Sequence, residues 1–463
     1  MVRPLLLGVI VALGSLAVAG VPAERGKPAT ISIDSGKQYQ SMRGWEATID
    51  LIDEDRRDMF LLAREEVFRR AVSEVGINRV RLEVRSGAES RSKNWLRYDA
   101  GEIPYEEWSK LRYVTVNDND DPREIDWSGF DFSELDRMIE EQVLPMREAV
   151  AARGERLFIN LCYVAFAKGL AGGAYIHDDP EEYAELVLAT YLHIQKKYGF
   201  EPDSWEVILE PDLVPQWTPR LVGEAIVAAT RRLEEHGFTP RFVAPSVTDT
   251  GNAARFIDGM AKVKGAMDHV VELSYHRYRR ATPTNVTAIA SLGAKYGLPT
   301  SMLELWFGRA RAEVLFEDLT VGGASAFQGR TLIGLFDLRR TEKGEVRVSL
   351  RQDVRKNLQI FKFVRMGAVR IGATSNAREA ALPVAFRNAD GGMVVAVLAS
   401  APGDFVFEGL DPGRYEVSYA GQSRSVRSPE LLTVSEDGRA EYSMPEAGVF
   451  TFATVKSPSD RAQ

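Results

Sequence analysis

Two glutamates follow short apolar runs and have the side chains that acid–base chemistry requires. Residues 205–209 lead into Glu210, and Pro211 stops the strand from continuing. Residues 301–303 lead in the same way into Glu304. Reactive groups of parallel barrels lie at strand carboxyl ends, so two such glutamates roughly a hundred residues apart predict a pair of catalytic carboxylates. The alternative is that both are ordinary strand-end charges.

A carboxylate pair can divide the work of a displacement reaction. Two carboxyls in different environments acquire different pKa values, so that one stays protonated as an acid while the other stays ionised as a nucleophile. A gap of roughly 5–5.5 Å between them indicates double displacement with retention of configuration.

Three further side chains are expected in the same pocket. His276 and Tyr278 alternate near the end of a predicted strand, so they share a face if the strand continues that far. The tyrosine hydroxyl, or the charge of Arg81, would hold a neighbouring carboxylate ionised. Core packing or a loop ion pair is the alternative for each.

Aromatic side chains are placed where a sugar ring could stack. Trp217 and Trp306 follow the two glutamates and are predicted sugar platforms, with core packing as the alternative. The long polar segment 85–132 is also rich in tryptophan and tyrosine. Long loops in compact domains tend to be functional, but these rings could equally pack the loop onto the body of the protein.

Alternating strands and helices would position these groups. We expect eight strands, one ending near Thr48 and the others at 77–84, 157–164, 205–209, 241–244, 269–274, 300–305 and 324–327. The intervening helices are expected at 55–75, 133–152, 178–197, 218–237, 253–263, 285–296, 309–319 and 352–363. A strand–helix repeat of about forty residues predicts an α/β fold, a (β/α)₈ TIM barrel that spans residues 42–366.

One predicted strand has an unusual pattern of charge. In residues 77–84, alternation places Arg79, Arg81 and Glu83 on the same side. A barrel interior would tolerate these charges only if they were paired.

A second domain is expected from both ends of the chain. After Gly367 the sequence changes to short alternating strands separated by Asp-, Pro- and Gly-rich turns. Residues 29–33 alternate like an edge strand. Residues 28–41 and 367–457 together predict an appended, discontinuous antiparallel β-sandwich.

The N-terminus has the pattern of a secretory signal peptide. Arg3 precedes an apolar run to Ala19, and small residues follow, which predicts a signal peptide over residues 1–23 and a secreted or periplasmic protein. The alternative is an uncleaved anchor, for which the run is short and interrupted by glycine. No later segment is apolar enough to span a bilayer, so we expect no stable membrane insertion after the signal is removed.

Composition excludes several classes of function. The formal net charge is −8, whereas a general nucleic-acid binder is normally basic, so we expect no nucleic-acid partner. The single cysteine, Cys162, lies in an apolar run and is expected to be a buried small hydrophobe. No Cys/His spacing suggests a metal site, and we expect neither a metal nor a cofactor. The sequence does not indicate an oligomeric state.

These features resemble clan A glycoside hydrolases, most closely family 30, the group of glucosylceramidase, xylanases and glucanases. The similarity lies in residues 38–45, 208–211, 302–304 and 361–372. It implies that Glu210 is the general acid/base and Glu304 the nucleophile. His276, Tyr278 and Arg81 match supporting positions.

Two departures from the family pattern concern the sugar site. The family has an asparagine before its acid/base glutamate, and this amide bonds the sugar 2-hydroxyl; here the residue is Leu209. The family usually has a tryptophan near the end of its eighth strand, where this chain has residues 326–329 without one. We therefore expect a rebuilt sugar subsite and do not carry over the substrate.

The resemblance predicts a secreted retaining β-glycoside hydrolase that acts on an oligosaccharide, polysaccharide or glycoconjugate by double displacement. One alternative is a catalytically decayed glycan-binding protein on a hydrolase barrel, which Leu209 motivates. Another is a barrel enzyme of a different reaction type, for which the two carboxyls would lie too far apart for retention.

Overall fold

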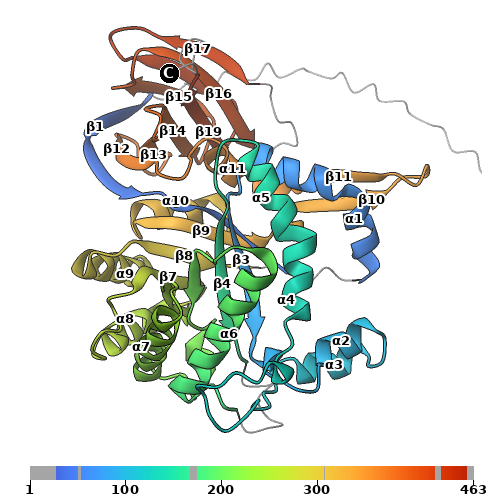
Figure 1. Cartoon of the computed structure of the whole chain (residues 1–463). Helices are drawn as coiled ribbons and strands as arrows, with labels where there is room; N and C mark the ends of the chain where they lie inside the picture. Colours follow the sequence, from blue (N-terminus) through green and yellow to red (C-terminus); the bar gives the residue numbers. More distant parts are fainter. Residues whose placement is uncertain (1–27, 51–53, 167–174, 307, 423–428, 456–463) are drawn as a thin grey trace, which may run out of the picture.

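The computed structural model describes residues 28–50, 54–166, 175–306, 308–422 and 429–455. It has two parts, a barrel surrounded by helices and a β-sheet domain that lies beside the barrel and packs against two of its outer helices (Figure 1). The predicted signal peptide, residues 1–23, lies outside the described residues. No helix in the described part of the chain has both the length and the apolar character needed to cross a bilayer.

The barrel is closed and parallel. Its strands follow one another in sequence order, and the last, β9, pairs with the first, β2. The strands are β2 (Gly44–Ile49), β3 (Arg79–Arg85), β4 (Phe158–Val164), β5 (Ser204–Glu206), β6 (Phe242–Asp249), β7 (Val270–Arg279), β8 (Thr300–Glu304) and β9 (Ala324–Thr331). Each predicted strand is present, so the prediction of a (β/α)₈ barrel is confirmed.

Helices cover the outside of the barrel. They are α1 (Glu54–Arg70), α4 (Ser133–Met138), α5 (Leu144–Ala151), α6 (Pro180–Tyr198), α7 (Pro219–Glu235), α8 (Thr250–Met260), α9 (Pro283–Tyr296), α10 (Ala312–Thr320) and α11 (Arg355–Phe361). The helix predicted at 55–75 ends in a π-helical turn at Ala71–Val75 and stops at Gly76, whose φ is 98°. The helix predicted at 133–152 has a similar turn at Ile139–Val143.

Local sequence explains why these helices begin where they do. The hydroxyl of Thr218 accepts a hydrogen bond from the N–H of Leu221, and Pro219 occupies the first turn of α7. The N-cap side chain accepts a hydrogen bond from one of the free backbone N–H groups at the start of the helix. Proline in the first turn has no N–H group that would need a partner. Asp179 and Pro180 begin α6 in the same way.

A β-hairpin between β9 and α11 was not predicted. Strands β10 (Phe336–Arg340) and β11 (Val346–Leu350) pair in antiparallel fashion and project beside α1 (Figure 1). Their sequences are rich in arginine and only partly buried, so they lack the apolar signal by which buried strands are recognised.

The segment 85–132 contains two short helices, α2 (Asn94–Asp99) and α3 (Tyr105–Leu111). Trp95 and Trp108 are buried in a small cluster of their own, and Trp108 stacks on Tyr98 with ring centroids 5.0 Å apart. For these rings the packing alternative is therefore correct.

The sheet domain is a single nine-stranded sheet, whose order is β17-β16-β19-β14-β13-β12-β1-β15-β18. It contains β1 (Ala29–Ser41), β12 (Val369–Ser375), β13 (Ala381–Arg387), β14 (Met393–Ala399), β15 (Gly403–Glu408), β16 (Gly413–Gly421), β17 (Glu430–Val434), β18 (Ala440–Met444) and β19 (Gly448–Thr454). The pairing is antiparallel except between β1 and β15. The N-terminal strand is thus interior, between β12 and β15, and not the edge strand that its alternation suggested.

The chain passes between the two parts at adjacent points. The N–H of Met42 donates to the carbonyl of Ala368 at 2.7 Å, and the N–H of Gly367 donates to the carbonyl of Met42 at 2.8 Å. One face of the sheet packs its own core, while residues such as Phe386 on the other face belong to the core cluster of the barrel. The sheet therefore covers apolar surface of the barrel.

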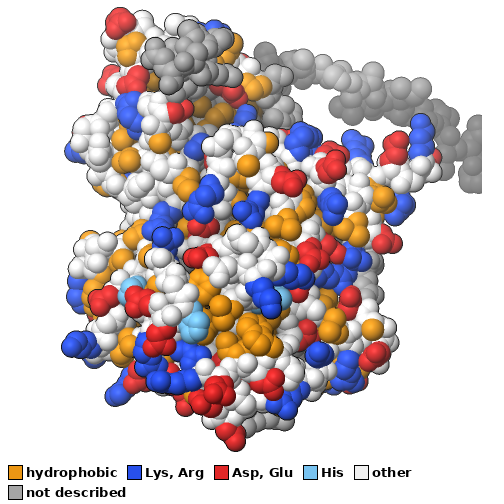
Figure 2. Space-filling model, viewed as in Figure 1, with side chains coloured by type: hydrophobic (Ala, Val, Ile, Leu, Met, Phe, Trp, Pro, Cys, Tyr) orange, Lys and Arg blue, Asp and Glu red, His pale blue; other side chains and the backbone are white. Residues whose placement is uncertain are grey.

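Acidic and basic side chains are interspersed over the face of the molecule drawn in Figure 2. This face carries no broad field of positive charge, which agrees with the acidic net charge of −8.

Candidate active site

Two glutamates project from the carboxyl ends of two strands of the barrel, β5 and β8. Glu304 is the last residue of β8. Glu210 follows β5 after an extended segment, in which the N–H of Val207 and the N–H of Leu209 still bond to the neighbouring strands. Strand β5 is shorter than the predicted strand 205–209, but the extended backbone still delivers Glu210 to the carboxyl end of this strand, as predicted.

The backbone of Glu210 is held in an uncommon conformation. Its φ and ψ are 53° and 56°, in the left-handed region, and its N–H donates to the carbonyl of Ser246 at 3.1 Å. Non-glycine residues in this region cost on the order of 1–3 kcal/mol and cluster at functional sites. Asp212 anchors the turn that follows, because it accepts from the N–H groups of Thr248 (2.8 Å) and Asp249 (3.1 Å).

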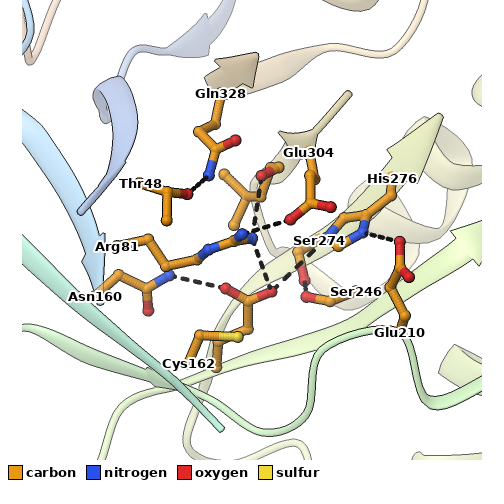
Figure 3. A network of polar contacts seen from close by, with 12 residues as sticks. Thr48, Arg81, Asn160, Cys162, Glu210, Ser246, Ser274, His276, Glu304 and Gln328 are labelled. Atoms are coloured by element: carbon orange, nitrogen blue, oxygen red, sulfur yellow. Dashed lines mark hydrogen bonds and ion pairs between the residues drawn. The ribbon is translucent and has the colours of Figure 1, made fainter. Parts of the chain in front are cut away.

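The two carboxylates approach each other closely. One oxygen of Glu210, one oxygen of Glu304 and a ring nitrogen of His276 all lie within 4.8 Å of one another. The two glutamates are 7% and 6% exposed, so they reach solvent only at one side. Figure 3 shows how these residues converge from different strands.

Glu304 is surrounded by groups that favour its ionised form. The Arg81 guanidinium forms an ion pair with Oε2, and the hydroxyl of Tyr278 donates to Oε1 at 2.9 Å. Burial alone would raise the pKa of Glu304, but Arg81, His276 and Tyr278 together lower it. Glu304 is therefore a carboxylate at neutral pH.

His276 connects the two halves of the site. Its Nδ1 lies 3.0 Å from Oε1 of Glu210, and its Nε2 lies 3.9 Å from Oε1 of Glu206. Burial favours the neutral ring, but the charges of Glu304, Glu206 and Glu210 outweigh it and raise the pKa of His276 to about 9. Because β7 continues to Arg279, His276 and Tyr278 both reach the carboxylates, as the alternation in the sequence predicts.

A layer of paired charges lies beneath the glutamates. Arg79 and Arg81 are fully buried, and Arg79 binds Glu46 and Glu272. Arg81 lies between Glu304 and Glu206, with its Nη1 3.9 Å from Glu206. Glu83, in contrast, is half-buried and pairs with Arg85. The expectation that charges on this strand face would be paired is thus correct.

Several members of this network were not found from the sequence. Glu206 accepts a 3.0 Å hydrogen bond from Asn160, and Arg81 and His276 outweigh its burial and lower its pKa to about 2. Ser246 bonds Ser274, and Gln328 donates to Thr48. A charged residue inside a short, otherwise apolar strand was the available signal, and Glu46, Glu206 and Glu272 all have it.

The two tryptophans differ in their placement. Trp217 is 1% exposed, packs against Tyr183, and donates its indole N–H to Tyr175 at 2.8 Å. It is therefore part of the wall behind the site, and the platform expected at Trp217 is not available for stacking. Trp306 is partly exposed, and its backbone N–H donates to the hydroxyl of Tyr278 at 3.2 Å, which places it next to Glu304.

Leu209 has an apolar environment. It is 3% exposed and belongs to a small cluster with Tyr113, Cys162 and Val164. Cys162 is a free, buried thiol, as expected. The side chain of Leu209 can neither donate nor accept a hydrogen bond at this place in the site.

Glu210, His276 and Glu304 are the only group of His, Cys, Asp or Glu in the described part of the chain whose donor atoms lie close enough to share an ion. Arg81 already occupies one oxygen of Glu304, and His276 carries a proton at neutral pH. Two positive groups beside the carboxylates disfavour a cation, so the donor set fits acid–base chemistry better than metal binding.

Comparison with known proteins identifies the fold. Neither a family model nor a curated protein matches the sequence. The structure is similar to a family 30 endoxylanase from Clostridium papyrosolvens, with a TM-score of 0.65 and 15% identity over 92% of this chain and 100% of that chain. A family 30 xylanase from Talaromyces cellulolyticus gives 0.64 and 15%, again over 92% of this chain and 100% of that chain.

Two other similar structures are a glucanase and a family 39 enzyme. An endo-β1,6-glucanase matches with a TM-score of 0.62 and 13% identity over 94% of this chain and 95% of that chain. A family 39 enzyme from Xanthomonas axonopodis matches with 0.55 and 12%, over 94% of this chain and 99% of that chain. The chain therefore has the fold of a clan A glycoside hydrolase that resembles family 30.

Proposed function

We propose that this protein is a retaining β-glycoside hydrolase that acts on an oligosaccharide, polysaccharide or glycoconjugate. The observation that carries the proposal is the convergence of Glu210 and Glu304, which have carboxylate oxygens within 4.8 Å of each other. Retaining enzymes hold their two carboxyls roughly 5–5.5 Å apart, whereas inverting enzymes leave room for a water molecule at roughly 6.5–9.5 Å. The short separation also disfavours the alternative of a barrel enzyme with carboxyls too far apart.

The environments of the two carboxyls support different roles. Arg81 and Tyr278 favour an ionised Glu304, which suits a nucleophile. Glu210 has no arginine partner among the described residues, and the negative charge of Glu304 lies close to it. With Glu304 as the nucleophile, Glu210 is left to act as the acid that protonates the leaving group and later as the base.

In the proposed reaction Glu304 attacks the anomeric carbon and forms a glycosyl ester while Glu210 gives its proton to the leaving oxygen. Water then attacks the same carbon, assisted by Glu210 as a base, and releases Glu304. His276 keeps Glu210 oriented through its Nδ1, and Tyr278 orients Glu304.

The second candidate function is glycan binding without turnover, and the burial of Leu209 is the observation that favours it. An apolar residue at this position supplies no bond to a sugar hydroxyl, so ground-state binding and transition-state stabilisation both lose a contact there.

A hydrolysis screen distinguishes the two candidates. The purified protein is incubated with aryl β-glycosides and with a panel of β-glycans, with Glu304→Gln as the matched inactive control. Turnover by the native chain alone, with the β-anomer of the product formed first in a proton NMR time course, is the expected result. Binding of a glycan with equal affinity by both proteins and no turnover by either would favour the second candidate.

We also propose that the protein is exported, on the basis of the signal-peptide pattern over residues 1–23. N-terminal sequencing of protein recovered from the periplasm or medium should give a first residue between positions 20 and 24. A mature chain that still begins at Met1 would contradict export by cleavage.

A further inference from the structure

A second group of buried carboxylates lies outside the catalytic network. Glu182 and Glu185 are three residues apart on α6 and share one face of the helix. The loop that follows α3 brings Asn117 and Asp118 against them, and Asn117 Nδ2 donates to Glu182 Oε1 at 3.4 Å. Glu89 completes the group, because its Oε1 accepts from the N–H of Asp118 at 3.3 Å. We refer to these five residues as the acidic cluster.

Glu185 is the central member of the acidic cluster. It is 0% exposed, and neither of its carboxylate oxygens has a hydrogen-bond partner among the described residues. Burial, together with the negative charges of Asp118, Glu89 and Glu182, outweighs Arg232 and raises the pKa of Glu185 to about 9, so that this carboxyl carries a proton at neutral pH when no cation is bound. Buried polar groups are normally hydrogen-bonded, and buried carboxylates are normally paired or bound to a metal.

Other oxygens of the acidic cluster are in the same state. Glu182 Oε2, Asp118 Oδ1 and Asn117 Oδ1 are also buried without a hydrogen-bond partner among the described residues. Their other side-chain atoms are engaged: Asp118 Oδ2, for example, accepts from the N–H of Asp126 at 2.6 Å. The side chains are therefore held in place while one oxygen of each is left without a donor.

We propose that the acidic cluster binds a divalent cation, and specifically Ca²⁺. The available donors are carboxylate and amide oxygens, which are the ligands that hard cations prefer. The single histidine nearby is already engaged, since His177 lies 2.8 Å from Glu89 through Nε2 and 2.8 Å from Tyr163 through Nδ1. A set of oxygens contributed by a helix and a loop suits the adaptable coordination of Ca²⁺ better than the strict octahedron of Mg²⁺.

The donor atoms of the acidic cluster are farther apart than those of a metal site with its ion bound. Its carboxylates are not a group whose donor atoms lie within 4.8 Å of one another, unlike those of Glu210, His276 and Glu304. Binding of Ca²⁺ would draw the loop that carries Asn117 and Asp118 closer to α6.

The cation would have a structural role behind the active site. Glu89 contacts His177, which contacts the hydroxyl of Tyr163 on β4. The carbonyl of Tyr163 accepts the N–H of Leu209 at 2.9 Å, one residue before Glu210. A cation that fixes Glu89 would therefore also stabilise His177 and Tyr163, and through them the backbone next to Glu210.

Calorimetric titration of the full-length protein after removal of metals with EDTA tests the proposal. Titration with CaCl₂ should show one site per chain, with MgCl₂ binding at least ten-fold more weakly and ZnCl₂ giving no site of comparable affinity. Thermal unfolding at a hundred-fold excess of Ca²⁺ over Kd should shift Tm upward by about 2–6 °C. Absence of both the binding heat and the Tm shift would overturn the proposal.

Variants locate the ion. Glu185→Gln should weaken Ca²⁺ binding at least ten-fold, and in EDTA at neutral pH it should unfold at nearly the same temperature as the native chain, because it replaces an uncharged carboxyl by an uncharged amide of the same size. Asp118→Asn provides a second test if Glu185→Gln does not fold. Glu148→Gln, at an exposed position of α5, is the control and should bind as the native chain does.

A further variant separates this proposal from the proposed function. Glu304→Gln should lose turnover but keep the same Ca²⁺ affinity, since it lies outside the acidic cluster. If Glu304→Gln abolishes Ca²⁺ binding while Glu185→Gln leaves it unchanged, the ion binds at the catalytic carboxylates and the acidic cluster is not the site.

Discussion

Nδ1 of His276 lies 3.0 Å from Oε1 of Glu210. The negative charges of Glu206 and Glu304 also act on the His276 ring. The imidazole is fully buried, yet the surrounding carboxylates raise its pKa from 6.5 to about 9. His276 is thus a buried cation that neutralises part of the negative charge of the site (Figure 3).

This raised pKa predicts a pH-dependent stability. The folded state holds the proton of His276 more tightly than the unfolded state, so the stabilisation is fully present below about pH 6.5 and is lost as the pH rises through about 9. The shift corresponds to a contribution on the order of 3 kcal/mol. Urea unfolding of the native chain and of His276→Gln at pH 6 and pH 9.5 should show a larger loss of unfolding free energy in the native chain.

A matched control distinguishes this effect from general alkaline destabilisation. His269 is partly exposed and lies 3.5 Å from Glu234 at the surface, so His269→Gln should keep the pH dependence of the native chain. Equal pH dependence in all three proteins would show that His276 does not bind its proton as described.

Residues of the site could be predicted where the sequence around each of them identified its place on a strand. Glu210, Glu304, His276 and Tyr278 stand at the ends of recognisable strands, so alternation and the strand–helix repeat place them correctly. The partners of Arg79 could not be chosen in this way, because Glu46 and Glu272 come from strands far apart in sequence and meet only when the barrel closes.

The prediction that Trp217 is a sugar platform was wrong for a related reason. Its position after the first glutamate suggested a platform, but exposure is a tertiary property, and Tyr183 and Tyr175 cover it. The hairpin of β10 and β11 and the interior position of β1 likewise follow from pairing partners, which a single strand's alternation does not specify.

Leu209 predicts a weak dependence on the sugar 2-hydroxyl. A site built to bond a hydroxyl rejects an analogue that lacks it by about 10⁴–10⁵-fold, but an apolar residue cannot exert this discrimination. Removing the 2-hydroxyl from a good substrate should therefore lower kcat/KM by less than about ten-fold. A loss on the order of 10³-fold or more would show that another donor takes this role.

The variant Leu209→Asn tests the same position from the protein side. It places an amide among Tyr113, Cys162 and Val164, which should cost about 1–3 kcal/mol of unfolding free energy. If the amide reaches the sugar instead, the kcat/KM ratio of the 2-hydroxy to the 2-deoxy substrate should rise while the native chain shows no such preference.

Removal of the sheet domain should inactivate the barrel. A chain that ends at Met366 leaves β1 without β12 and exposes the apolar face of α11, where Thr451 otherwise donates to the carbonyl of Gln359 at 2.7 Å. Unpaired edges and exposed apolar patches promote aggregation. We expect an insoluble or unfolded product, judged by gel filtration and circular dichroism, whereas a control chain that ends at Val455 should remain soluble and active.

The outcome that contradicts this prediction is a soluble, fully active barrel without residues 367–463. Such a result would show that the contacts between the sheet and α11 contribute little to the folding of the catalytic part.

Replacement of Glu304 should remove the covalent step. In Glu304→Gln the amide cannot form a glycosyl ester, so turnover should fall to background on every substrate. The substitution also takes the ion-pair partner from the buried Arg81, so unfolding free energy has to be measured alongside activity. A folded Glu304→Gln variant that retains full activity would place the nucleophile elsewhere.

Replacement of Glu210 should have a different signature, because an acid matters most when the leaving group is poor. Glu210→Ala should lose about 10²–10⁴-fold in rate on substrates with alkoxide leaving groups and much less on activated phenyl glycosides. Added azide should partly restore turnover in Glu210→Ala and give a β-glycosyl azide, since azide attacks the covalent intermediate on Glu304. In Glu304→Ala, azide attacks the substrate directly and should give the α-glycosyl azide; reversed anomers in the two variants would reverse the roles of the two glutamates.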